Sequence, residues 1–167
     1  TDFIPGSLYL DNTVARGNIG LNGASIEGRL SLEGMNVYGE AELTGMWIGE
    51  NFILSKSYFR DILRCEKSHC KGTLSSYAAR FRAEASFDSM TCQKVGISAS
   101  SFDQGFTMRK IRIAESLSLN NVDVDGKADL SRASFREIYF DHFLVDYLLL
   151  DRNQLGKELA SEQKGNY

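Results

Sequence analysis

GNIGLNGASIE (residues 17–27) is followed by GRLSLEGMNVY (28–38) and by GEAELTGMWIG (39–49). The three segments have the same length, and apolar residues occupy the third, fifth, eighth and tenth positions of each. Self-similarity at a fixed period is typical of repeat architectures, so we extended this eleven-residue frame in both directions along the chain.

The frame continues over residues 6–136 as twelve units, of which one, 83–92, is a residue short. The third position is apolar in every unit, and the fifth is apolar in all but the unit that carries Ser76. None of the four positions holds a charged residue in any unit, although 25% of the chain is charged. We interpret the four positions as the interior of the fold.

The spacing of the apolar residues predicts an all-β solenoid. One residue separates the two members of each apolar pair, so each pair is expected to form a short strand with both side chains pointing inward. The last residue of one pair and the first of the next lie alternately three and four positions apart, which does not follow the helical period. Two units then make one coil of about 22 residues with four sides, and about six coils are expected in total. The spacing alone leaves a three-sided β-helix open.

Two kinds of local sequence support this architecture. Glycine is frequent at the first and seventh positions, where a corner of the coil favours φ values that glycine adopts with little strain. Stretches such as Ala24-Ser-Ile26-Glu-Gly28 and Ala133-Ser-Phe135-Arg resemble the pentapeptide repeat, in which a small residue and a central Leu or Phe both point inward. The resemblance covers residues 6–136 and implies a right-handed, four-sided β-helix. The chain departs from it by inserting one residue into every second pentapeptide.

The repeat is expected to fade after Arg136, which predicts three segments: a lead-in (1–5), the β-helix (6–136) and a C-terminal helical cap with a tail (137–167). Asp141 is a typical N-cap residue, and leucines follow it at helical spacing. A solenoid end exposes core side chains and unpaired strand edges, so such a helix would cover the last coil. The same stripe would alternatively make a homodimer contact. It consists of Leu144, Leu148, Leu155 and Leu159.

Composition limits the setting of the protein. The net charge of −3 gives no whole-chain argument for binding nucleic acid or a membrane surface. No apolar run approaches the roughly 18 residues that a transmembrane helix needs. The chain begins with neither Met nor a signal peptide. We therefore expect a module of a larger bacterial protein, cytoplasmic or, if the protein is an effector, translocated.

Candidate chemistry is sparse. Cys65, Cys70 and Cys92 occupy inward positions, where a thiol behaves as a small apolar group. His69 is expected to point outward, away from the neighbouring thiols, and zinc needs four converging ligands. The sequence contains no P-loop, HExxH motif or serine-protease arrangement. We expect no metal, no cofactor and no catalytic residue.

The outward positions predict one binding surface. Residues two units apart stack on the same face, and this spacing brings tyrosine and arginine side chains into neighbouring columns. Such pairs allow cation–π contacts, and tyrosine, tryptophan and arginine are enriched in binding hot spots. The alternative is a solvated ladder without a partner. The candidate strip consists of Tyr38, Tyr58, Arg60, Arg80, Arg82 and Trp47.

Three functions compete at this point. The first is a non-catalytic scaffold for protein–protein interaction, a role that the resemblance associates with modules of larger bacterial proteins and effectors. The second is a DNA-mimicking gyrase binder, which would need a strongly acidic rod in place of the basic strip. The third is a carbohydrate-active β-helix enzyme, which would need a cluster of carboxylates on one face. We expect the scaffold.

Overall fold

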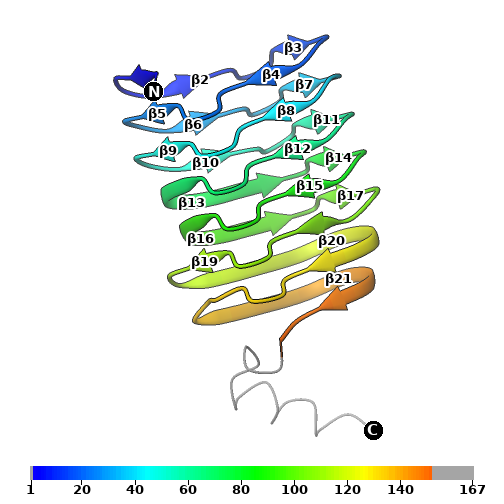
Figure 1. Cartoon of the computed structure of the whole chain (residues 1–167). Coiled ribbons are helices and arrows are strands. Elements are labelled where there is room, and N and C mark those ends of the chain that lie inside the picture. The colour runs from blue at the N-terminus through cyan, green and yellow to red at the C-terminus, as the bar shows by residue number, and fades with distance from the viewer. Residues whose placement is uncertain (1, 152–167) are drawn as a thin grey trace, which may run out of the picture.

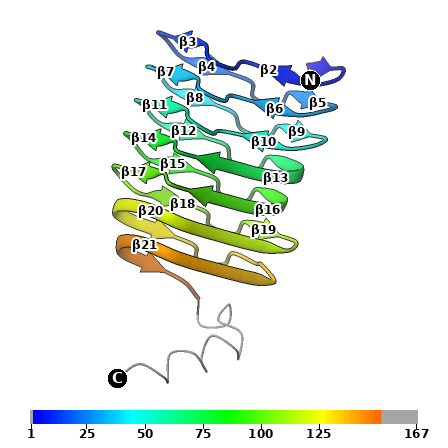
Figure 2. The ribbon, with the colours of Figure 1, turned by 180° about the vertical axis from the view of Figure 1, so that it is seen from behind.

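The computed structural model describes residues 2–151, which wind into a stack of coils with the N-terminus at one end and the last strand at the other (Figure 1). All pairings between the 21 strands of this part of the chain are parallel, and they join the strands into one continuous sheet. Figure 2 shows the same regular stack from behind. The all-β solenoid predicted from the sequence is confirmed.

Four ladders of strands run along the stack. The first contains β2 (Leu8–Tyr9), β6 (Leu30–Ser31), β10 (Phe52–Ile53), β13 (His69–Tyr77), β16 (Thr91–Ser98), β20 (Ser116–Asp129) and β21 (Glu137–Leu149). The second contains β3 (Val14–Ala15), β7 (Asn36–Val37), β11 (Tyr58–Phe59), β14 (Arg80–Phe81) and β17 (Ser101–Phe102), and it ends in later parts of β20 and β21.

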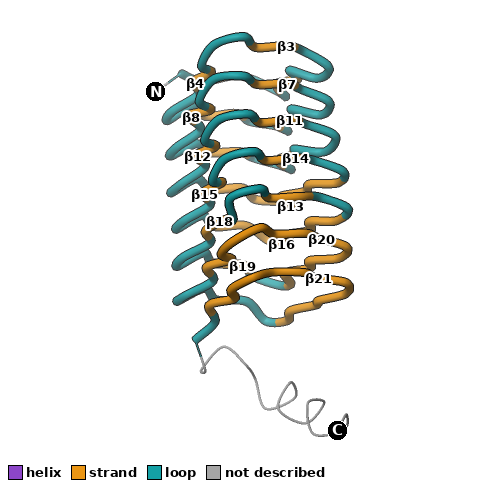
Figure 3. Tube along the Cα trace, turned by 90° about the vertical axis from the view of Figure 1, so that its right-hand side faces the viewer, coloured by secondary structure: helices purple, strands orange, loops and turns teal. Residues whose placement is uncertain are grey.

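The third ladder contains β4 (Ile19–Gly20), β8 (Ala41–Glu42), β12 (Leu63–Arg64), β15 (Ala85–Ser86) and β18 (Phe106–Thr107), and it also ends in β20 and β21. The fourth contains β1 (Phe3–Ile4), β5 (Ser25–Ile26), β9 (Trp47–Ile48) and β19 (Arg112–Ile113), joined through the first residues of β13 and β16. In the side view of Figure 3, strands of successive turns lie directly below one another.

The register gives the length of a turn and the number of turns. Leu30 pairs with Phe52 and Phe52 with Leu74, two full units further along each time, whereas Leu74 pairs with Val95, one position earlier, across the short unit. The expected coil of two units is confirmed. The first ladder has seven members, so the expectation of six coils is wrong: Leu8, Leu30, Phe52, Leu74, Val95, Leu117 and Ile138.

The four apolar positions of the repeat line a dry axis. From Ala24 to Ala133 the residues at these positions are buried, and they form one continuous core. The buried serines among them are hydrogen-bonded: the Ser57 hydroxyl donates to the Leu54 carbonyl at 2.5 Å, and the Ser68 hydroxyl donates to the Leu43 carbonyl at 2.9 Å. The core therefore tolerates a hydroxyl where a backbone carbonyl or a neighbouring hydroxyl pairs with it.

The seventh position forms a left-handed corner in every unit. Its φ lies between 48° and 69°, whether the residue is glycine or not. Three units have glycine there, and the others place a polar or small residue in the same conformation. The corner is therefore a property of the repeat, and the ten side chains that adopt it do so at some cost in strain. The residues are Asn12, Gly23, Gly34, Gly45, Lys56, Lys67, Ala78, Ser89, Ala99, Lys110, Asn121, Arg132 and His142.

Gly39, at the first position of its unit, allows close approach between turns. The Asn18 side chain accepts a hydrogen bond from the Glu40 amide of the next turn at 3.0 Å. A Cβ at Gly39 would overlap that side chain and lie 2.6 Å from the carbonyl carbon of Gly17. At Gly39 the requirement is space and not a positive φ, whereas Gly6 and Gly126, also at first positions, do have a positive φ.

The predicted C-terminal helix is wrong for the described residues, among which there is no helix. Residues 137–149 form β21, which pairs with β20 along most of its length. Asp141 lies inside this strand, Leu144 is 66% exposed on its outer side, and Leu148 points inward and is half-buried. Leu155 and Leu159 lie outside the described residues. The predicted homodimer contact through a C-terminal helix is therefore also wrong for the described residues.

The repeat in fact continues through this strand. Ile138, Phe140, Phe143 and Val145 pair with the four inward residues of the preceding turn, and Leu148 begins the next apolar pair. The gap from Phe135 to Ile138 and the gap from Val145 to Leu148 each contain one residue fewer than the repeat requires. These two deletions shift the frame, so the eleven-residue pattern fades although the apolar pairs persist.

Aromatic stacking along the second ladder gives the first prediction. Phe81 lies between Phe59 and Phe102, at centroid distances of 5.5 and 4.5 Å and interplanar angles of 3° and 7°. Phe81→Ala should lower the free energy of unfolding by about 3–5 kcal/mol, because both neighbours lose their contact surface and a cavity remains. Phe81→Leu retains most of the volume and should cost about 1 kcal/mol. Urea denaturation followed by circular dichroism measures both, and equal losses would contradict the stacking.

The left-handed corner gives the second prediction. Ala78 has φ of 53° and is exposed, so Ala78→Gly should stabilise the protein by about 1 kcal/mol by removing Cβ strain. Gly45, with φ of 68°, has open space where a Cβ would stand, so Gly45→Ala should cost about the same amount. The midpoints of urea denaturation give the comparison, and shifts in the opposite directions would refute the left-handed corner.

Candidate functional site

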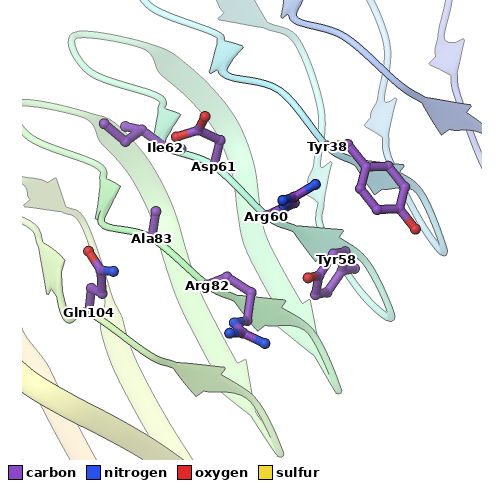
Figure 4. A pocket seen from close by; sticks show the side chains of 8 residues that line it. All are labelled: Tyr38, Tyr58, Arg60, Asp61, Ile62, Arg82, Ala83 and Gln104. Atoms are coloured by element: carbon purple, nitrogen blue, oxygen red, sulfur yellow. Dashed lines mark hydrogen bonds between the residues drawn. The ribbon is translucent and has the colours of Figure 1, made fainter.

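A hollow of about 760 Å³ lies on the outside of the solenoid, at the corner between the second and third ladders. One wall consists of side chains on or directly after strands of the second ladder, and the other consists of residues directly before strands of the third (Figure 4). The lining residues are Tyr38, Tyr58, Arg60, Asp61, Ile62, Arg82, Ala83 and Gln104.

The register of the second ladder brings the first wall together. Tyr38, Arg60 and Arg82 each stand one residue after a strand of this ladder, after β7, β11 and β14 respectively. Their amides bond to the turn above: the Arg60 N–H donates to the Val37 carbonyl, and the Arg82 N–H donates to the Phe59 carbonyl. The backbone of this wall is therefore fixed by the ladder, and the side chains extend outward from it.

The second wall is made by the corner itself. Asp61 and Ile62 precede β12, and the Ile62 amide donates to an Asp61 carboxylate oxygen at 2.8 Å, which holds the turn. One turn further on, the position equivalent to Asp61 is Ala83, and this small side chain leaves space beside the arginines. Gln104 occupies the same position in the following turn.

Two tyrosines form the aromatic end of the hollow. The rings of Tyr38 and Tyr58 pack edge to face, with centroids 6.0 Å apart and an interplanar angle of 61°. Tyr58 is half-buried, whereas Tyr38 is 44% exposed. The pair presents an amphipathic surface of low conformational entropy, which suits contact with a ligand side chain.

The arginines differ in their partners. Asp103 forms ion pairs with both Arg80 and Arg82, at N–O distances of 3.0 and 2.8 Å, and it accepts a hydrogen bond from Arg80. The hydrogen bond with Asp103 and the charge of its carboxylate raise the pKa of the Arg80 guanidinium above its usual value. Arg60 has no ion pair with any residue in the part of the chain that the structure describes. Its guanidinium remains available to an anionic group in the hollow.

The structure gathers most of the predicted strip and separates the rest. Tyr38, Tyr58, Arg60 and Arg82 line the hollow, and Arg80 lies beside them in register with Tyr58. Trp47 belongs to the fourth ladder, two sides away along each turn, where it pairs in register with His69.

The Trp47 side chain is 36% exposed and makes a separate contact on that side of the solenoid. The Lys71 ammonium lies over the Trp47 ring, 5.1 Å from the ring centroid, in a cation–π contact. Trp47 is thus a separate surface feature and no part of the hollow.

Four lining residues were missed by the sequence analysis. Asp61, Ile62, Ala83 and Gln104 are at the first or second positions of their units, and the strip contained only residues from the ninth and eleventh positions. Small residues at this corner were the feature of the sequence that could have indicated a hollow there. Gly39 and Ala83 are two such residues in one column.

The three thiols point into the core as predicted. Cys65, Cys70 and Cys92 are buried and free, and Cys70 and Cys92 pair in register in adjacent turns. Burial raises the pKa of all three thiols, that of Cys92 to about 12.

No group of three or more His, Cys, Asp or Glu residues in the described range is arranged to hold a metal ion. Within the same range no helix is long and apolar enough to cross a membrane.

Thiol burial gives the third prediction. With pKa values raised by burial, the native thiols stay protonated at pH 8, so none should react with Ellman's reagent within minutes. Three thiols should react at once after unfolding in guanidinium chloride. Ser89→Cys, at an exposed corner, should add one fast thiol to the native protein. Rapid reaction of a native cysteine in the unsubstituted chain would place that side chain outside the core.

Comparison of the chain with models of known protein families, with curated proteins and with solved structures found no match in any of the three.

Proposed function

We propose that the protein is a non-catalytic scaffold that binds a protein partner in the hollow. The observation that carries this proposal is the composition of one corner of the coil, where two tyrosines and two arginines from successive turns line a single concavity. Tyrosine and arginine are enriched among residues that dominate binding energy at interfaces. The further idea of a module in a bacterial effector rests on the resemblance to pentapeptide repeats alone.

The solenoid supplies a rigid support for such a site. The second ladder fixes the backbone that carries Tyr58, Arg60 and Arg82, and the stacked phenylalanines lie directly behind it. Binding to a preorganised surface loses less conformational entropy than binding to a loop. The hollow also spans several turns, so a partner would contact side chains that are distant in sequence but held in register.

The lining residues support binding more than chemistry. Asp61 is the single carboxylate among them, and its oxygen accepts a hydrogen bond from its own turn. The lining contains no histidine, thiol or second carboxylate to act with it as a general acid or base. A DNA mimic would need a continuous acidic surface, whereas Arg60 and Arg82 face the hollow.

Charge reversal in the hollow gives the fourth prediction. A variant with Arg60→Glu, Arg80→Glu and Arg82→Glu should lose the bound partner, because a wall that attracts anions becomes one that repels them. The melting temperature should change little, since all three side chains are exposed. Affinity capture from the source cells, with quantitative mass spectrometry, compares the proteins retained by the variant and by the unsubstituted chain.

The matched control reverses the same amount of charge elsewhere. Lys67→Glu, Lys110→Glu and Arg112→Glu alter three exposed cations at and beside the corner between the third and fourth ladders. Partners that bind the hollow should be retained by this control and lost by the first variant. Partners retained equally by both variants would reject the hollow as the binding site.

A further inference from the structure

The side of the solenoid that carries the hollow changes its charge along the axis. Two columns of outward side chains run down the second ladder; over residues 38–125 they are basic or aromatic in the earlier turns and acidic in the later ones, whereas Val14 and Asn36 precede Tyr58 in its column. In order along the chain, this part of one column contains Tyr58, Arg80, Ser101 and Asp123, and this part of the other contains Tyr38, Arg60, Arg82, Asp103 and Asp125.

At the boundary one carboxylate partly neutralises two guanidinium groups, whereas the charges on either side have no such partner. Asp103 pairs with the two arginines nearest to it. Arg60 on one side, and Asp123 and Asp125 on the other, are exposed and make no ion pair within residues 2–151. The surface therefore has a positive end with the two tyrosines and a negative end without them.

The distance between the two ends fits an extended peptide. Arg60 and Asp125 are three turns apart, which corresponds to about 14 Å at the usual strand spacing. An extended chain rises about 3.3 Å per residue, so about four residues cover the distance. A segment lying along the solenoid axis could then place an acidic side chain over Arg60 and a basic one over Asp125.

We propose, on the basis of the scaffold function above, that the hollow binds an extended peptide segment whose charges form two blocks. The acidic block contacts Arg60 and Arg82, and the basic block contacts Asp123 and Asp125. Charge complementarity of this kind sets orientation and rejects wrong partners more than it adds affinity. The tyrosine pair next to Arg60 gives the acidic end of the segment an aromatic surface to pack on.

The same pattern disfavours a nucleic acid strand. A strand that placed phosphates against Arg60 and Arg82 would carry its next phosphates toward Asp123 and Asp125, since its negative charges recur along the whole backbone. Like charges at the second end would oppose binding. The charge pattern thus selects a ligand that changes sign within a few residues, as a peptide does.

The experiment uses the full chain, labelled with nitrogen-15, and three synthetic peptides. The block peptide is acetyl-Glu-Glu-Ser-Ser-Lys-Lys-amide, and its isomer, acetyl-Glu-Lys-Ser-Ser-Lys-Glu-amide, has the same composition. The third, acetyl-Glu-Glu-Ser-Ser-Glu-Glu-amide, is acidic throughout. The block peptide should shift the amide resonances of Arg60, Arg82, Asp123 and Asp125, with a Kd about fivefold lower than that of either other peptide, since it alone satisfies both ends.

Two variants test the assignment of each end. Arg60→Glu should weaken the block peptide about fivefold or more, with Arg60→Ala as the milder substitution if the first unfolds the protein. A double variant with Asp123→Lys and Asp125→Lys should reverse the preference, binding the fully acidic peptide more tightly than the block peptide. Both variants change exposed side chains only.

Several results would overturn the two-block assignment. Equal binding of the block peptide and its isomer, or of the block and fully acidic peptides, would show that the order of charges is not recognised. Absence of shifts in the hollow at millimolar peptide, or shifts there with an oligothymidine of similar length instead, would also overturn it. If the triple arginine reversal still abolished partner capture, the scaffold would stand and only its ligand class would be wrong.

Discussion

The packing of apolar side chains from successive turns along a shared axis is the constraint on which the rest of the structure depends. Most strands of a turn are only two residues long, too short to be stable alone. Each turn gains its stability by placing its inward residues on those of the next, as the stack of Phe59, Phe81 and Phe102 shows. Hydrogen bonds between turns then keep the polar backbone satisfied around this dry interior.

The candidate site follows from that constraint. Because inward residues fix the register, the outward residues between them are stacked at the same period. Tyr58 therefore lies beside Arg80, although the two residues are a full turn apart in the sequence. The hollow lies at a corner where the first position carries the small residue Ala83, between Asp61 and Gln104 of the neighbouring turns. Selection on a few outward side chains can therefore change the surface without disturbing the core.

Most of the interior was predictable from the sequence, because inward positions exclude charge and recur at a fixed spacing. The same argument predicted that Arg60 and Arg82 share a column. It failed near the C-terminus because the deletions before Ile138 and Leu148 shift the frame, and isolated leucines then fall at helical spacing by coincidence. In β21 the strand pattern prevails, since pairing with β20 continues the ladder and half-buries inward side chains such as Ile138 and Val145. Residues of the corner, such as Asp61 and Ala83, could not be assigned to the hollow because the repeat period does not specify how a corner is shaped.

The central claim is that residues one turn apart in the sequence are neighbours in space, with the register given by the apolar pairs. Nuclear Overhauser effects between backbone protons of paired strands test it most directly. The account predicts contacts between Leu30 and Phe52, which are two full units apart in the sequence. Between Leu74 and Val95, and between Leu117 and Ile138, it predicts contacts at a separation one position shorter. A constant separation through all turns, or sequential helical contacts over residues 137–149, would contradict it.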